Sequence, residues 1–336
     1  MRRITQKDIA RKLGISVMTV SRVVNNSKYV SEKTREKVLK LIEKENYFPN
    51  SIAKALRTNK IFSIGVIIRY TGNIFSIPYF IQLLEGIEET CIEKNYDIVI
   101  SPWGETKFEY QRIFSSRKAD GFVILAPGIH DEEIKNLKKN SYIPYVIINN
   151  IGDFHYVTTD NFRGAYEMTK YLIECGYKNI AFVKGLPFVR DSIERYDGYK
   201  KAFEDFNKKL DENLIFNSGY AFEDGLKLAD EIIKLKKKPD AIFACNDMMA
   251  LGLIKKLKEY GIKIPDDIGI AGFDNILQAE YASLTTVDQQ ISLIGKKSAE
   301  ILINLIENNK KNIKNYFQVK IPTKLIIRQT TKKLNN

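Results

Sequence analysis

One group of side chains near the N-terminus could read the edges of DNA bases. They are expected to be exposed on one short helix, and they are Val17, Met18, Ser21 and Arg22. Arg22 can donate two hydrogen bonds to guanine O6 and N7, whereas Val17 and Met18 offer apolar contacts, for instance to a thymine methyl. Neighbouring hydroxyl and amide groups suit phosphate contacts, which fix register without reading sequence. These are Ser16, Thr19 and Asn25.

A second group could bind a small polar molecule. Its members follow strands or begin helices, and they are Asn149, Asp160, Arg195, Asn246 and Asp274. Ligands of open parallel sheets bind outside the carboxyl ends of the strands, so these residues predict a polar cleft. Phe75 and Tyr79 could supply flat apolar walls, as sugar and purine sites use. Each polar residue could instead cap a helix, and Asp247 in particular occupies a cap position.

Two short helices must position the base-reading group. Thr5 fits an N-cap and Asp8 completes a capping box. Gly14 ends this helix, because glycine tolerates the left-handed conformation of a C-cap. Ser16 then caps a helix over residues 17–24. Two helices joined by a short glycine turn are typical of the helix-turn-helix, whose second helix enters the major groove.

A third helix and a short segment complete this module. Ser31 is expected to cap the helix, whose inward side carries Val38, Leu39, Ile42 and Tyr47. Residues 50–57 have helical propensity but are too few to fold alone, so they should order only against DNA or a second copy. Ala53 is small enough for a minor groove, and Leu56 suits an apolar wedge between base steps.

Positive charge concentrates in the same module. Residues 1–60 carry 15 Lys/Arg and 5 Asp/Glu, a net charge of +10, while the 336-residue chain carries +12. A basic terminal module on a nearly neutral body is the pattern of a polyanion-binding protein. A solvated lysine-rich surface would look the same, so the helix pattern is what favours DNA.

After Lys60, strands alternate with helices in two successive series, which predicts parallel, doubly wound sheets in two lobes. The first series has strands over 64–68, 97–100, 121–125 and 146–148, and a helix over 80–94 with Leu83, Leu84, Ile87 and Ile92 on one side. The second has a helix over 164–174 and strands over 180–183, 241–244 and 268–272.

Other classes of protein are disfavoured. The chain has no glycine-rich phosphate loop, no nucleophile–base set and no metal spacing, so we expect no enzyme, metal or other cofactor. Cys91, Cys175 and Cys245 are expected to be buried free thiols. The apolar runs have strand length and none follows Met1-Arg2-Arg3, which favours a cytoplasmic protein without a membrane span.

The N-terminal residues resemble the headpiece and hinge helix of the LacI/GalR repressor family. The collinear matches are Asp8-Ile9-Ala10, Gly14-Ile15-Ser16, Thr19 to Asn25, Val30-Ser31, Thr34-Arg35, Tyr47, Pro49-Asn50, Ala53 and Leu56. In that family the headpiece reads an operator half-site, and the paired hinge helices enter the minor groove, where the residue at Leu56 wedges a base step. The resemblance adds Thr5, Ser31, Asn50 and Lys54 to the expected DNA contacts. Lys54 stands in place of the usual arginine.

The body resembles the effector domain of the same family, which is similar to periplasmic sugar-binding proteins. Matching runs include Asp120–Ile124, Asp160–Ala165, Arg195–Tyr199, Phe243–Asp247 and Gly269–Asn275. The resemblance implies effector contacts at Arg195, Asn246 and Asp274, with Asp160 close by. Asn149 stands where many members carry aspartate, and Ile77-Pro78-Tyr79-Phe80 replaces the usual Asn-Pro-aromatic-aromatic, which leaves the effector open.

We therefore expect an N-terminal three-helix helix-turn-helix headpiece with a hinge helix, followed by a two-lobed α/β periplasmic-binding-protein-like domain with parallel doubly wound sheets. The expected segments are a headpiece over 1–48, a hinge over 49–60 and an effector domain over 61–330. Lobe 1 comprises about 61–158 and 287–320, and lobe 2 about 159–286 and 321–330.

The expected function is that of a homodimeric repressor on a near-palindromic double-stranded DNA operator. A small polar effector, expected to be a sugar or sugar derivative, would control it. The alternative is a soluble sugar-binding protein without a DNA-directed function, and the missing leader sequence disfavours it. The sequence leaves open the operator, the regulated genes, the sign of the ligand's effect and any protein coregulator.

Overall fold

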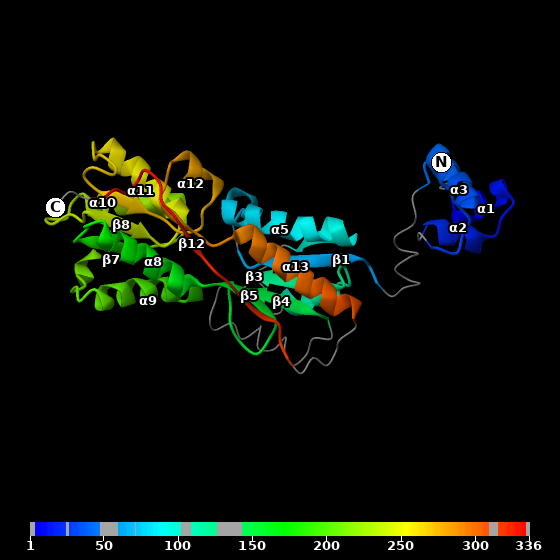
Figure 1. Ribbon diagram of the computed structural model, residues 1–336, viewed down its shortest axis with the longest axis horizontal. Coiled ribbons are helices and arrows are strands. Elements are labelled where there is room, and N and C mark those ends of the chain that lie inside the picture. The colour runs from blue at the N-terminus through cyan, green and yellow to red at the C-terminus, as the bar shows by residue number, and fades with distance from the viewer. Residues whose placement is uncertain are drawn as a thin grey trace. The chain divides into compact units, whose positions relative to one another are not determined.

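The computed structural model describes residues 4–24, 27–47, 60–70, 72–101, 109–125, 143–308 and 315–333. The chain divides into two compact units, Met1–Phe62 and Ser63–Asn336, and each is described by itself. Figure 1 shows their helices and strands. Within the described ranges, no helix combines the length and the apolar character needed to cross a lipid bilayer.

Three helices form the first unit: α1 (Gln6–Leu13), α2 (Val17–Val24) and α3 (Glu32–Lys44). Apolar side chains at helical spacing from all three helices meet in one core. Its nearly fully buried members are Ile9, Ala10, Val20, Val23, Val38 and Tyr47, the last lying just after α3. This small core holds α2 against the other two helices.

Local capping defines where these helices begin and end, as the sequence predicts. The Thr5 hydroxyl accepts a hydrogen bond from the Asp8 N–H at 3.4 Å, and the Asp8 carboxylate accepts one from the Thr5 N–H at 3.0 Å. Gly14 ends α1 with φ of 63°. Ser16 and Ser31 cap α2 and α3 through their hydroxyl groups.

The first lobe of the second unit is built on a six-stranded parallel sheet in the order β11-β5-β4-β3-β1-β2. The strands are β1 (Ser63–Ile68), β2 (Asp97–Ser101), β3 (Gly121–Leu125), β4 (Tyr145–Ile148), β5 (Tyr156–Thr159) and β11 (Gln318–Ile321). Its helices are η1 (Ile74–Ser76), α5 (Pro78–Lys94), α6 (Glu109–Ser115) and α13 (Ile291–Glu307). Helices α5 and α13 lie side by side (Figure 1), and so closely that a Cβ on Gly86 would lie 1.8 Å from the Ser292 carbonyl oxygen.

The second lobe is built on a four-stranded parallel sheet in the order β7-β6-β8-β9. The strands are β6 (Ile180–Lys184), β7 (Ile215–Asn217), β8 (Ala241–Ala244) and β9 (Gly269–Ala271). The helices are α8 (Asn161–Glu174), α9 (Arg190–Asp205), η2 (Glu212–Leu214), α10 (Phe222–Ile232), α11 (Asp247–Glu259) and α12 (Leu277–Tyr281). The predicted pair of parallel sheets is confirmed.

Three chain segments connect the lobes. One leads from β5 into α8, the second contains β10 (Thr286–Asp288) and continues into α13, and the third runs from β11 into β12 (Lys324–Ile326). Strands β10 and β12 pair antiparallel and form a small separate sheet. Functional residues carried by these crossings can therefore contact both lobes.

Two expectations about inward-facing residues are wrong. Leu39 is 48% exposed and Ile92 is 70% exposed, whereas the preceding Val38 and Cys91 are buried. Successive residues of an α-helix are rotated by about 100° around its axis. Because Val38 and Cys91 face the core, the residues that follow them point toward solvent. All three cysteines are buried and unpaired, as expected.

Candidate functional site

The N-terminal part of α2 exposes the side chains expected to read DNA. Val17 and Met18 are 40% and 64% exposed, although both are apolar, and Arg22 is also exposed. Helical spacing places Arg22 on the outer side of α2 because Val20 and Val23 face the core. The expectation that Ser21 is exposed is wrong, because this residue of α2, between Val20 and Arg22, is buried.

The other residues expected to contact DNA divide into two sets. Thr5, Ser16 and Ser31 are exposed and their hydroxyl groups cap helices, and the Ser16 and Thr19 hydroxyl oxygens lie 2.9 Å apart. The second set lies outside the described residues and comprises Asn25, Asn50, Ala53, Lys54 and Leu56.

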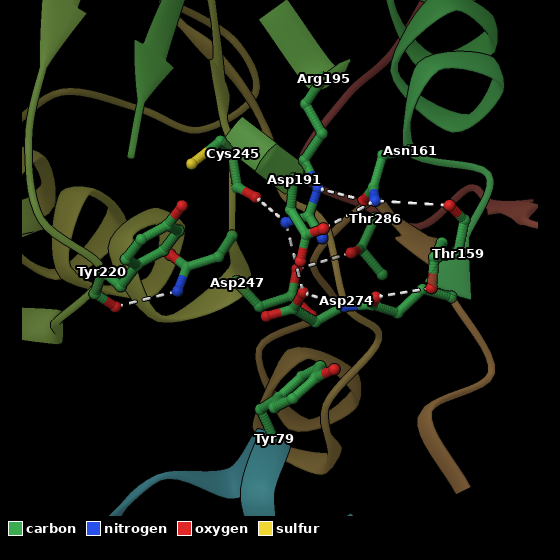
Figure 2. A network of polar contacts seen from close by, with 12 residues as sticks. Tyr79, Thr159, Asn161, Asp191, Arg195, Tyr220, Cys245, Asp247, Asp274 and Thr286 are labelled. Atoms are coloured by element: carbon green, nitrogen blue, oxygen red, sulfur yellow. Dashed lines mark hydrogen bonds and ion pairs between the residues drawn. The ribbon is translucent and has the colours of Figure 1, made fainter. Parts of the chain in front are cut away.

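The second candidate site is a network of buried polar side chains where segments from both lobes meet (Figure 2). Its residues come from the end of β5, the segments that follow β9 and β10, and the first two turns of α8 and α9. We call Thr159, Asn161, Asp191, Arg195, Asp274 and Gln289 the polar network. Tyr79, from the start of α5, lies beside it.

Arg195 is the centre of the polar network. Its guanidinium donates through Nε to Asn161 Oδ1 at 2.8 Å and through Nη1 to the Cys245 carbonyl oxygen at 2.5 Å. Nη1 also lies 3.7 Å from Asp274 Oδ1, and the guanidinium carbon lies 3.8 Å from the centroid of the Phe273 ring. Only 3% of Arg195 is exposed, so these contacts replace its hydration.

Asp274 joins this arginine to a crossing between the lobes. Gln289 donates through Nε2 to Asp274 Oδ1 at 2.5 Å, and its Oε1 accepts from the Thr159 hydroxyl at 3.1 Å. Burial raises the pKa of Asp274 well above its ordinary value, against the opposing effect of Arg195. Its φ of 133° is a conformation that L-residues rarely adopt, and such strain concentrates at functional sites.

Asp191 is a second buried carboxyl group in the polar network. It lies one turn before Arg195 on α9, and its Oδ1 accepts a hydrogen bond from Asn161 Nδ2 at 3.1 Å. Burial raises the pKa of Asp191 to about 6, although the neighbouring Arg195 lowers it. The network therefore contains two carboxyl groups and one guanidinium.

A pair of lobe 1 side chains lies beside the polar network. Asn149, directly after β4, donates through Nδ2 to the Tyr79 hydroxyl at 2.8 Å. Burial raises the pKa of Tyr79, and the Asp191 and Asp274 carboxyl groups raise it further. Asn149 Oδ1 is buried and has no hydrogen-bond partner among the described residues. A buried acceptor of this kind requires a partner such as a ligand or water.

Other expected effector residues have structural roles. Asn246 caps α11 by accepting from the Met249 N–H at 3.0 Å. Asp160 caps α8 and forms an ion pair with Lys320 at 2.9 Å. The expectation that Asp247 is the cap is wrong, because its carboxylate instead accepts from the Ile276 N–H and the Thr286 hydroxyl. Phe75 is 62% exposed.

Four members of the polar network were not among the expected site residues: Thr159, Asn161, Asp191 and Gln289. A signal existed for Asp191, because it precedes Arg195 by four residues and so shares its helix face. Asn161 directly follows Asp160, which had been singled out. Gln289 follows β10 and offered no local pattern, since its partners Thr159 and Asp274 come from other segments.

Comparison with known proteins identifies the family. Residues 5–50 match the model of bacterial regulatory proteins of the lacI family, and residues 169–331 match a periplasmic binding protein-like domain. The chain is 34% identical to the HTH-type transcriptional repressor PurR of Vibrio atlanticus over 339 residues, covering 98% of this chain and 99% of that protein. The chain belongs to the lacI family. It is a transcriptional repressor and not an enzyme.

Solved structures resemble this lacI-family repressor over 81–98% of its length. The transcriptional regulator CelR in complex with cellobiose is 26% identical, with a TM-score of 0.73, covering 98% of this chain and 100% of that one. The Lac repressor dimer bound to operator and the anti-inducer ONPF has a TM-score of 0.83 at 24% identity, with the same coverage, and supports the fold. A family member from Enterococcus faecium with bound ribose is 28% identical, with a TM-score of 0.71 over 81% of this chain and 100% of that one.

Proposed function

We propose that this repressor binds a near-palindromic operator as a homodimer and that a small polar effector, held between the two lobes, controls its affinity for DNA. The observation that carries this proposal is the buried polar network around Arg195 and Asp274, with the unpartnered Asn149 Oδ1 beside it. Buried charges and an orphaned acceptor are costly unless a ligand uses them. On this proposal residues 49–60 form the hinge.

The groups of the network suit hydroxyl groups of an effector. Arg195 and Asp274 offer a donor and an acceptor side by side, and Asn149 offers a further acceptor. The solved relatives with cellobiose and ribose support a sugar or sugar derivative, whereas the name PurR of the curated relatives points to a purine-related compound. The hydroxyl-binding character of Asp274 and Asn149 favours the sugar class.

Coupling to DNA would pass through the crossings between the lobes. A ligand that engages Asp274 alters its contact with Gln289, which is hydrogen-bonded to Thr159 at the end of β5. The chain then continues from Gln289 into α13, which packs closely on α5 of lobe 1. A preference of the ligand for one arrangement of the lobes would change operator affinity by a coupling free energy of about 1–3 kcal/mol.

On the DNA side, Arg22, Val17 and Met18 would read bases from α2. Because Val17 and Met18 are exposed and apolar, part of the operator should be recognised through thymine methyl groups. The capping residues Ser16 and Thr19 would also contact phosphates, as would the segment containing Lys54 and Leu56.

Enrichment of genomic upstream fragments by the full chain, followed by gel shift, tests the proposal. We expect a near-palindromic site bound at least about 1,000-fold more tightly than a scrambled duplex of equal length. Arg22→Ala should relax selection at one base of each half-site. Failure of the folded protein to enrich any sequence would contradict the proposal and favour a sugar-binding protein without a DNA-directed function.

Two variants test whether the effector binds at this site. Asn149→Ala removes the unpartnered acceptor without disturbing a charge, and Arg195→Ala removes the central cation. Both should bind the operator normally and respond weakly or not at all to a compound that changes wild-type affinity. Thermal melting verifies that each variant is folded. A normal ligand response in both variants would exclude this site.

A further inference from the structure

The polar network carries more negative than positive groups. Asp191 and Asp274 are 8% and 5% exposed, and both lie near Arg195; Arg190 also lies near Asp191, but it is paired with Glu194. A third buried carboxyl group, Asp247, is satisfied separately by the Ile276 N–H and the Thr286 hydroxyl. Burial of a carboxylate requires compensation by a cation or several hydrogen bonds. Asp274 lies 3.7 Å from Arg195 and accepts from Gln289, whereas Asp191 accepts only from Asn161 among the described residues.

Asp191 lacks a cation of its own. Arg195 is directed to Asn161, the Cys245 carbonyl and Asp274, while Arg190 pairs with Glu194 at 3.1 Å. Within the described part of the chain, no Lys or Arg nitrogen lies within 4.0 Å of the Asp191 carboxylate. The helix dipole stabilises an acidic side chain in the N-terminal turn of α9. This stabilisation does not require burial, so it does not explain why Asp191 is buried.

Two acceptors in this site, the Asp191 carboxylate and Asn149 Oδ1, lack a full set of partners among the described residues. The buried Arg190 Nε and the Tyr220 hydroxyl also lack a partner there, and these two polar atoms can donate. The carboxylate accepts one hydrogen bond, from Asn161, and none at its other oxygen among the described residues. Asn149 Oδ1 is a second acceptor without a partner, and the Asn149 amide donates to the Tyr79 hydroxyl of lobe 1 at 2.8 Å. A ligand that contacts both Asp191 and Asn149 Oδ1 must present hydrogen-bond donors to them.

We propose that the effector presents a protonated amine to Asp191 while its hydroxyl groups contact Asp274 and Asn149. The proposal rests on the proposed function, in which this site holds the effector. It specifies a cationic, hydroxylated small molecule of the amino sugar class, because an ammonium group supplies the missing charge and three donors. The raised pKa of Asp191 agrees with this, since burial favours the protonated acid despite the opposing effects of Arg195 and Arg190. Anionic sugars such as sugar phosphates would meet two carboxyl groups and are disfavoured.

Matched sugar pairs test the proposal on the full chain by isothermal titration calorimetry. The probes are D-glucosamine, D-galactosamine and D-mannosamine against D-glucose, D-galactose and D-mannose, with D-glucose 6-phosphate, hypoxanthine and guanine as comparison compounds. At least one amino sugar should bind about ten-fold or more tightly than its neutral parent, as charge pairs in buried interfaces allow. Asp191→Asn should bring that ratio close to one.

Two variants control the test. Asp205→Asn removes an exposed carboxylate at the far end of α9 and should retain the preference for the amine. Asp191→Ser also removes the negative charge but has a smaller side chain. It therefore shows whether a loss of amine preference in Asp191→Asn comes from the charge or from the packing of asparagine. Thermal melting establishes that each variant is folded.

The remaining outcomes overturn the inference. Tightest binding of a neutral sugar, a purine base or the sugar phosphate would exclude the amine, as would absence of binding by every amino sugar or a preference that survives in both Asp191 variants. None of these results bears on specific operator binding. That property decides the proposed function separately.

Discussion

Replacement of Asp191 by asparagine should stabilise the protein in the absence of ligand. Asparagine preserves the size of the side chain and the oxygen that accepts from Asn161, but it removes the ionisable group. Burial raises the pKa of Asp191 from its ordinary value of 3.8 to about 6. At neutral pH this difference corresponds to about 3 kcal/mol of unfolding free energy. The wild type bears that cost because its carboxyl group must ionise inside the protein.

The pH dependence follows from the direction of this shift. Below about pH 4 the carboxyl group is protonated in both folded and unfolded chains, so variant and wild type should be equally stable. As the pH rises toward 6, the folded chain retains a proton that the unfolded chain has released, and the wild type loses stability relative to Asp191→Asn. Above about pH 6 the difference should be complete. The charged groups near Asp191 are Arg190, Glu194 and Arg195, with Asp274 beyond them.

Thermal unfolding followed by circular dichroism between pH 4 and 8 measures the effect. In a unit of this size 1 kcal/mol shifts the Tm by about 2–4 °C, so Asp191→Asn should melt about 6–12 °C higher at pH 7.5. The control Asp205→Asn removes a carboxylate whose pKa is lowered by Lys201, and it should show no such gain. A lower Tm of Asp191→Asn at pH 7.5 would refute the reasoning, as would a gain that does not shrink toward pH 4.

Three further substitutions test other parts of the account. Arg195→Ala should abolish the effector response in gel shifts and leave operator binding intact; a normal response would remove Arg195 from the site. Arg22→Ala should cost about 1–3 kcal/mol at one base position in competition binding, and equal losses on all sequences would show a phosphate contact instead. Leu56→Ala should weaken specific operator binding and reduce DNA bending in a circular-permutation gel assay, whereas unchanged affinity and bend would contradict the wedge.

The parts of the fold that depend on local rules could be predicted from the sequence. The caps at Thr5, Ser16 and Ser31 are hydrogen bonds to residues three positions away. Both partners of each cap are therefore close together in the sequence and can be recognised from it. The strands of both sheets are short apolar runs, which identify buried parallel strands when helices separate them. The errors at Leu39 and Ser21 concern residues next to a core residue in the sequence, Val38 and Val20, where a misplacement of the helix face by one residue reverses the expected exposure.

The candidate site was only partly predictable because its contacts join distant segments. Arg195 and Asp274 could be expected near one sheet edge, but their partner Gln289 follows a crossing strand with no local pattern. Asn246 and not Asp247 caps α11, because an offset of one residue at the end of β8 decides which side chain accepts from the Met249 N–H, and Asp247 instead accepts from the Ile276 N–H. Three-dimensional packing determines such offsets.

The affinity of the full chain for its enriched operator, with and without each small molecule of the panel, tests the central claim most directly. Fluorescence anisotropy at fixed salt measures it, because salt alone changes DNA affinity steeply. We predict that at least one compound changes operator affinity by about 5-fold to 150-fold and that the change disappears in Arg195→Ala. Unchanged affinity with every compound, or a change that persists in that variant, would contradict control from the Arg195 and Asp274 site.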